Sequence, residues 1–249
     1  MSVQKNQPSA PWKKPVLCLL AAIIILVMLR LAVWQLDRAE AKRQIASQLY
    51  SRTEQAAKPL SDLLDVNSTD LRFRNVILEG QFIADKTIFL DNQVINGSVG
   101  YQVFTPFLVS SSQTSVLLAR GWVAVGETRD VLPTISTDTT SQVVTGRFNL
   151  PAVRPPLWDE KYDVVDGQRW QFLPMQEVSQ QLGLDLFPLV VELAPDEVGA
   201  NALVRKWPKI DDQWVAKHQG YAFQWFAMAA AFFIACLVLL FRRSARSDI

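Results

Sequence analysis

Two long apolar blocks near the ends of this chain restrict its fold more than any other feature. Residues 16–34 contain Arg30 as their only charge, and residues 221–241 are apolar apart from Gln224. Because a helix rises about 1.5 Å per residue, each block is long enough to cross a hydrocarbon core of roughly 30 Å. We therefore predict transmembrane helices at 16–36 and 218–241, with a separate domain between them.

The charges around the two blocks predict the orientation of the chain. Three lysines precede the first block and three arginines follow the second, whereas residues 35–218 carry a net charge of −5. Positively charged flanks stay in the cytoplasm, so we expect cytoplasmic tails at 1–15 and 242–249 and an exported middle domain. A cleaved secretory signal is the alternative for the first block, but the sequence resembling a cleavage site, at 39–41, lies ten residues beyond Leu29.

The segment between the blocks predicts a helical extension at 37–58 and a mainly β domain at 59–217. Residues 34–55 are rich in helix formers and lack Gly and Pro. Farther along, apolar runs bounded by turn residues predict strands, and residues 174–182 predict a helix ended by Gly183. The predicted strands lie at 73–82, 87–92, 101–109, 116–125, 142–150, 170–173 and 188–193. Short strands at hairpin spacing favour an α+β domain built as an antiparallel barrel or sandwich.

Residues suited to catalysis are scarce between the blocks. Cys18 and Cys236 both fall inside the apolar blocks, where we interpret them as small helix residues, with a redox or copper role as the alternative. No zinc-binding cluster or phosphate-binding loop is evident, and a Ser nucleophile would lack a histidine base within the domain. Arg120 and Trp122 could contact a ligand, although a strand Trp beside a Gly is more often core material. We therefore do not expect an enzyme.

The single histidine, His218, lies just before the second apolar block. On a helix, His218, Tyr221 and Trp225 share one stripe, together with Ala222 and Ala229. An imidazole followed by aromatic and small residues could form a wall for a large flat ligand such as a haem. The alternative is a polar group at the membrane interface, where Tyr and Trp are common in any case.

Three groups of residues together resemble one family, the surfeit locus cytochrome c oxidase assembly factors. The first helix ends in Trp-Gln-x-x-Arg-x-x-x-Lys, and the last begins with His-x-x-Tyr-Ala-x-x-Trp-Phe. Between them lie Asp-Asn, Gly-Tyr-x-Val, Thr-Pro and Leu-Leu-Ala-Arg-Gly-Trp-Val, in the family's order. The first group lies at 34–42, the middle group comprises 91–92, Gly97, 100–106 and 117–123, and the last group lies at 218–226. This chain departs from the family pattern at Ala32, where a Gly is common, and at Ala216 and Lys217, where asparagines usually precede the histidine.

The resemblance implies a bacterial assembly factor in the inner membrane, with its main domain in the periplasm. Such a protein acts on oxidase subunit I and with the haem a synthesis machinery while haem a is inserted. His218 matches the family histidine proposed as the haem iron ligand, with Tyr221 and Trp225 as further cofactor contacts. If the missing asparagines orient that imidazole in other members, its support here must come from elsewhere.

Two alternatives remain open at this point. The protein could be a scaffold that grips subunit I and never touches haem, or a membrane-anchored enzyme if the barrel holds a pocket with perturbed carboxylates. Small residues at Ala227, Ala231 and Ala235 predict a face of the second span that packs against the first span or against an oxidase helix.

Overall fold

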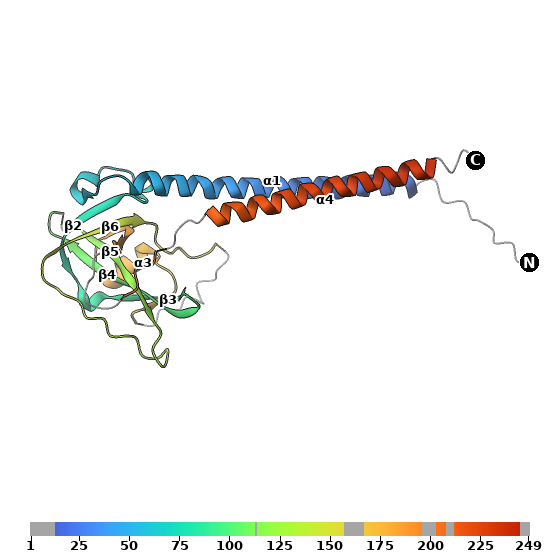
Figure 1. The fold of residues 1–249 in the computed structure, drawn as a ribbon. Helices are drawn as coiled ribbons and strands as arrows, with labels where there is room; N and C mark the ends of the chain where they lie inside the picture. The colour runs from blue at the N-terminus through green and yellow to red at the C-terminus, as the bar shows by residue number, and fades with distance from the viewer. Residues whose placement is uncertain (1–12, 113, 157–166, 196–202, 208–211, 245–249) are drawn as a thin grey trace, which may run out of the picture. The chain divides into compact units, whose positions relative to one another are not determined.

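The chain forms two compact units in the computed structural model (Figure 1), which describes residues 13–112, 114–156, 167–195, 203–207 and 212–244. The helical unit comprises Met1–Ser47 and Lys209–Ile249, and the barrel unit comprises Gln48–Pro208. Of the predicted tails, residues 1–12 and 245–249 lie outside the described residues.

Two long helices build the helical unit. Helix α1 is unbroken over Lys13–Thr53, so the predicted helical extension at 37–58 is helical only as far as Thr53. Helix α4 spans Asp212–Ser244. Each contains an apolar stretch long enough to cross a membrane, and only 6% of each stretch is buried. A core helix of a water-soluble domain would bury such a stretch, so the exposure favours two membrane helices.

The less exposed residues of both helices recur at alternating spacings of three and four. Along α1 they include Ala21, Ile25, Met28, Ala32, Gln35 and Ala39. Along α4 they include Val215, His218, Ala222, Trp225, Ala229, Phe232 and Cys236. This spacing averages 3.5 residues, which is the spacing of contact positions where two helices pack side by side. We call it the helix seam.

Alanines bring the two helices close together along the helix seam. Ala32, Ala222 and Ala229 are 0%, 1% and 3% exposed. The prediction that the alanines at 227, 231 and 235 pack against the first span is wrong, because all three are exposed. Residue 227 lies five residues beyond Ala222 and therefore about 140° around the helix from it.

Five strands close into a barrel in the other unit. They are β2 (Asn75–Phe82), β4 (Ser98–Val109), β5 (Ser115–Ala124), β6 (Gln142–Asn149) and β8 (Leu186–Leu193). The order is β2-β6-β8-β5-β4, and β4 pairs back with β2. Of the two predicted architectures, barrel or sandwich, the structure has the barrel, but β5 and β8 run parallel, so it is not wholly antiparallel. The long connection from β5 to β8 allows this direction, which a hairpin would forbid.

Shorter elements complete the barrel unit. They are β1 (Lys58–Pro59), η1 (Leu60–Leu63), α2 (Ser68–Leu71), η2 (Ala84–Lys86), β3 (Ile88–Ile95), β7 (Arg169–Trp170) and α3 (Met175–Leu182). A turn with positive φ at Asn96 and Gly97 joins β3 to β4, as Asn-Gly predicts. Strand β2 begins two residues later than predicted because Phe73, at φ 69°, interrupts the extended chain.

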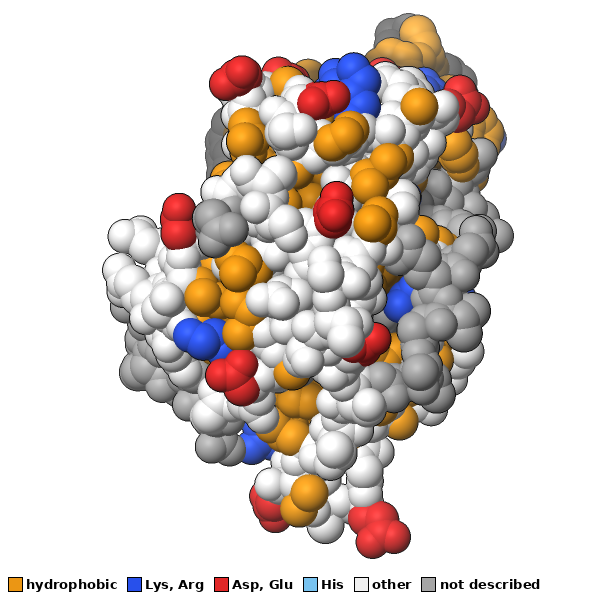
Figure 2. Space-filling model, turned by 90° about the vertical axis from the view of Figure 1, so that its left-hand side faces the viewer, with side chains coloured by type: hydrophobic (Ala, Val, Ile, Leu, Met, Phe, Trp, Pro, Cys, Tyr) orange, Lys and Arg blue, Asp and Glu red, His pale blue; other side chains and the backbone are white. Residues whose placement is uncertain are grey.

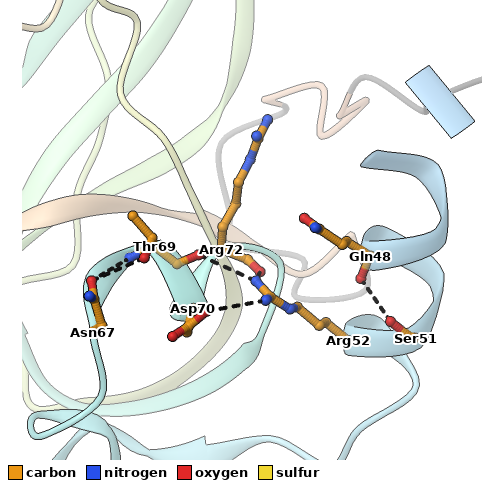
Figure 3. Close-up of polar contacts among 7 residues, drawn as sticks. All are labelled: Gln48, Ser51, Arg52, Asn67, Thr69, Asp70 and Arg72. Atoms are coloured by element: carbon orange, nitrogen blue, oxygen red, sulfur yellow. Dashed lines mark hydrogen bonds and ion pairs between the residues drawn. The ribbon is translucent and has the colours of Figure 1, made fainter. Parts of the chain in front are cut away.

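Within the barrel unit, Arg52 joins the last turn of α1 to the segment around α2 (Figure 3). Its Nη1 donates to the carbonyl oxygens of Arg72 at 2.9 Å and Thr69 at 3.4 Å, and its Nη2 lies 3.6 Å from Asp70 Oδ1. Asn75 adds a bond from its Nδ2 to the carbonyl oxygen of Thr53 at 2.9 Å. These donors reach carbonyls that a helix end or a turn leaves unpaired.

Apolar side chains from all five barrel strands fill the barrel. Among the least exposed are Val76, Leu78, Phe107, Leu118, Phe148 and Val191. On the face drawn in Figure 2, the hydrophobic side chains lie in separate patches divided by polar and charged groups. Scattered apolar residues of this kind are ordinary for a protein surface.

Two glycines allow the barrel strands to approach closely. Gly80 pairs with both neighbours of β2, and a Cβ there would collide with the carbonyl oxygen of Leu108. A Cβ at Gly146 would lie 2.6 Å from the carbonyl oxygen of Glu192. The two strands that carry them share an aliphatic run followed by Gly, a polar residue and Phe. The shared pattern reflects the same requirement for space in both strands.

We expect Gly146→Ala to lower the free energy of unfolding by roughly 2–4 kcal/mol, because the neighbouring backbone must move. Thermal unfolding of the purified full chain, followed by circular dichroism, measures the effect. Gly126→Ala is the matched control, since its Cβ would meet nothing within 4 Å. Equal stability of the two variants would contradict the close approach.

Candidate functional site

The imidazole of His218 makes one specific contact in the helix seam. His218 is half-buried on α4, and its Nδ1 lies 2.7 Å from Oε1 of Gln35 on α1. An amide oxygen only accepts hydrogen bonds, so this contact requires the tautomer of His218 in which Nδ1 carries the proton. The lone pair of the neutral ring is then on Nε2, which is the arrangement of a metal-binding histidine.

The other predicted site residues lie on different sides of α4. Trp225 is half-buried in the helix seam, seven residues beyond His218, with the buried Ala222 between them. Tyr221 is 54% exposed, because three residues turn a helix by 300° and place it about 60° off the line of the seam. The roles of Tyr221 and Trp225 as cofactor contacts therefore stay predictions.

Gln35 was not predicted as the partner of His218. In the sequence it is the second residue of the Trp-Gln pair at the end of the first apolar block, and nothing in that pair indicates a contact with His218. The signal that could have found it is the spacing of the helix seam, which places one polar side chain on each helix among apolar and small residues. Two such groups in an apolar seam are expected to pair, since a buried polar group without a partner is costly.

The available donors limit the kinds of metal group that could bind. Among the described residues, no cluster of three or more His, Cys, Asp or Glu could hold a metal ion. A bare zinc or copper ion needs such a set, whereas a haem brings four nitrogen ligands and needs one or two axial ones. A single imidazole with Nε2 available is the kind of donor that an axial haem position uses.

Arg120 serves the packing of the barrel unit. The residue is 7% exposed, and its guanidinium lies 5.0 Å from the centre of the Phe82 ring. Its Nη2 donates to the carbonyl oxygen of Ser136 at 3.1 Å, and its Nη1 donates to the hydroxyl of Thr137. Burial, and secondly the charge of Arg205, lower the pKa of Arg120 to about 10. Arg120 thus holds the loop between β5 and β6 against the barrel.

Two further polar groups of the barrel unit also have structural partners. Trp122 donates from Nε1 to the carbonyl oxygen of Gln93 at 2.9 Å. The pKa of Asp138 is lowered by hydrogen bonds from the backbone and hydroxyl of Thr140, and its side chain is fully exposed. This exposed turn is not the pocket with perturbed carboxylates that the enzyme hypothesis requires.

Comparison with known proteins places the chain in a family. The model of the SURF1 family matches residues 22–230, which include both partners of the Gln35–His218 contact. The chain belongs to the SURF1 family. This confirms the resemblance inferred from the sequence motifs.

Relatives in the SURF1 family occur in bacteria and eukaryotes. A SURF1-like protein of Rickettsia bellii is 28% identical over 247 residues, covering 94% of this chain and 92% of that protein. The cytochrome oxidase assembly protein SHY1 of Saccharomyces cerevisiae is 31% identical over 113 residues, covering 45% of this chain and 29% of that protein. A SURF1-like protein of Dictyostelium discoideum is 31% identical over 104 residues, covering 38% of this chain and 37% of that protein.

We expect Arg120→Met to loosen the loop that contains Ser136 and Thr137 and to lower the free energy of unfolding by about 1–3 kcal/mol, because several hydrogen bonds are lost. Hydrogen exchange of the full chain would show faster exchange in that loop. Arg43→Met is the control, since Arg43 lies outside this loop and its ion pair with Glu40, with side chains 56% and 53% exposed, contributes at most about 1 kcal/mol. Unchanged exchange in the loop would contradict the anchoring role.

Proposed function

We propose that this protein is an assembly factor for the haem-copper cytochrome c oxidase and that it holds haem a transiently at His218 before insertion into subunit I. Membership of the SURF1 family and the name of the yeast relative support the assembly role. The observation that supports haem binding is the contact from His218 Nδ1 to Gln35, because it leaves Nε2 available as an axial donor.

The surroundings of His218 suit a haem in transit. The ring lies at the start of the apolar part of α4, where Tyr221 and Phe223 are 54% and 75% exposed. Haem is too apolar to travel free in water, and apolar side chains beside the ligand would reduce its contact with water. The imidazole of His218 would hold the haem through a bond to the haem iron. A single axial bond from the protein allows release more easily than two.

The proposed location follows from the charge pattern. The positive flanks of both apolar helices favour cytoplasmic ends and an exported barrel unit. The family resemblance adds that the membrane is the inner membrane and the exported side is the periplasm. In this orientation His218 lies at the periplasmic end of the apolar stretch. We propose that the haem a synthesis machinery delivers haem there and that subunit I receives it.

A scaffold without haem is the second candidate, and the exposed side of α4 favours it. Residues 227, 231 and 235 are alanines spaced by four that do not contribute to the helix seam. Small residues at this spacing allow a helix of another membrane protein to approach closely. An oxidase helix could bind this side whether or not the protein carries haem.

A visible spectrum of the detergent-purified full chain, expressed in cells that make haem a, tests haem binding. We expect a Soret band in the wild type and loss of most of it in His218→Ala, because the axial ligand is removed. Gln224→Ala is the control, since it alters an exposed polar residue of the same helix. A colourless wild type would contradict haem binding and favour the scaffold.

The scaffold candidate makes a separate prediction. Ala231→Leu should reduce the amount of subunit I that co-purifies with the protein, because the larger side chain prevents close helix contact. It should leave the Soret band unchanged, since residue 231 lies outside the helix seam. Unchanged recovery of subunit I would contradict a role for this side of α4.

A further inference from the structure

The Gln35–His218 pair is a polar contact inside an otherwise apolar seam. The seam positions that precede and follow Gln35 on α1 are Ala32 and Ala39, which are 0% and 3% exposed. Those around His218 on α4 are Val215 and Ala222, which are 8% and 1% exposed. Each polar group therefore has small or apolar neighbours along its own helix, so an unpaired imidazole or amide here would bear the cost of burial without a hydrogen bond.

We propose that Gln35 is a positioning residue that selects the Nδ1–H tautomer of His218 and so makes Nε2 the atom that binds haem iron. This inference rests on the proposed function. Free histidine in water prefers the opposite tautomer, with the proton on Nε2, and its remaining lone pair on Nδ1 is crowded by the residue's own Cβ. A fixed acceptor beside Nδ1 reverses that preference and also fixes the plane of the ring.

The chemical nature of the acceptor matters for release. A carboxylate beside a ligating histidine increases the basicity of the ring and strengthens its bond to a metal. Gln35 offers a neutral amide oxygen at the same position, so the ring remains a donor of moderate strength. A protein that must give up its haem needs a ligand of this kind. Gln35 thus provides orientation without the stronger retention that Glu would give.

The acceptor for Nδ1 does not come from the residues just before His218. These are Ala216 and Lys217, and neither an alanine side chain nor a lysine ammonium can accept a hydrogen bond. The acceptor comes instead from the other helix, at a distance of 2.7 Å. Orientation of His218 therefore depends on the packing of α1 against α4.

Nuclear magnetic resonance of the haem-free full chain in lipid nanodiscs tests the tautomer directly. His218 is the only histidine, so labelling with ¹⁵N-histidine reports on one ring without assignment. We expect the wild type to show a protonated Nδ1 and an unprotonated Nε2. In Gln35→Leu the signals should shift toward the Nε2–H form, whereas Gln224→Leu should match the wild type. An Nε2–H ring in the wild type, or an unchanged ring in Gln35→Leu, would overturn the proposal.

Haem titration then tests the consequence for binding, with haem a and iron protoporphyrin IX as probes. We expect Gln35→Leu to bind haem roughly 10- to 100-fold more weakly than the wild type, which is the usual effect of losing a partner of a ligating histidine. Gln35→Asn should behave similarly, because its shorter side chain withdraws the oxygen. Equal affinity in all three proteins would overturn the positioning role and leave haem binding by His218 intact.

Transfer of haem to apomyoglobin measures release from the loaded protein. We expect Gln35→Glu to release haem more slowly than the wild type, by roughly tenfold or more, because a carboxylate strengthens the ligand. Equal or faster release would overturn the argument from the neutral amide. If the wild type held the Nδ1–H tautomer yet bound neither probe, the haem part of the proposed function would fail while tautomer selection by Gln35 would stand.

Discussion

The close packing of two helices through alanine is the constraint on which the candidate site depends. With Ala32, Ala222 and Ala229 almost fully buried, the helix seam is narrow enough for an amide on α1 to reach an imidazole on α4 at 2.7 Å. Larger side chains at these positions would separate the helices and break that hydrogen bond. The seam therefore combines two tasks, holding the helices together and setting the chemical state of a single ring.

The barrel unit satisfies a different constraint, which is closure of five short strands around a small core. Closure brings neighbouring backbones into contact at Gly80 and Gly146, where a methyl group would not fit. It also buries polar groups, and these are paired across strands: Glu192 accepts bonds of 2.6 Å from Arg147 and 2.7 Å from Asn149. The buried guanidinium of Arg120 is also paired, because it donates hydrogen bonds to oxygens of Ser136 and Thr137 in the β5–β6 loop. These contacts stabilise the barrel unit and do not by themselves define a ligand site.

Much of the fold could be predicted because its signals are local. Two apolar blocks predicted the long helices, Asn96-Gly97 predicted a hairpin turn, and Gly183, at φ 61°, ends α3 as expected. The parallel pairing of β5 with β8 could not be predicted, since strand direction depends on the route of a long connection. The packed side of α4 was also misjudged: several alanine stripes run along that helix, and only the partner helix decides which one is buried. The chemistry of its side chain singles out His218 in the sequence. Identifying Gln35 as its acceptor also requires the register of α1 against α4.

The separation of the two partners along the chain has a consequence for biosynthesis. Gln35 and His218 are 183 residues apart, with the entire barrel unit between them. A growing chain can therefore complete α1 and every strand while still lacking the imidazole. Any product that stops before α4 has no candidate site, however well its barrel folds. The order of synthesis thus leaves the candidate site incomplete until the last helix has joined the first.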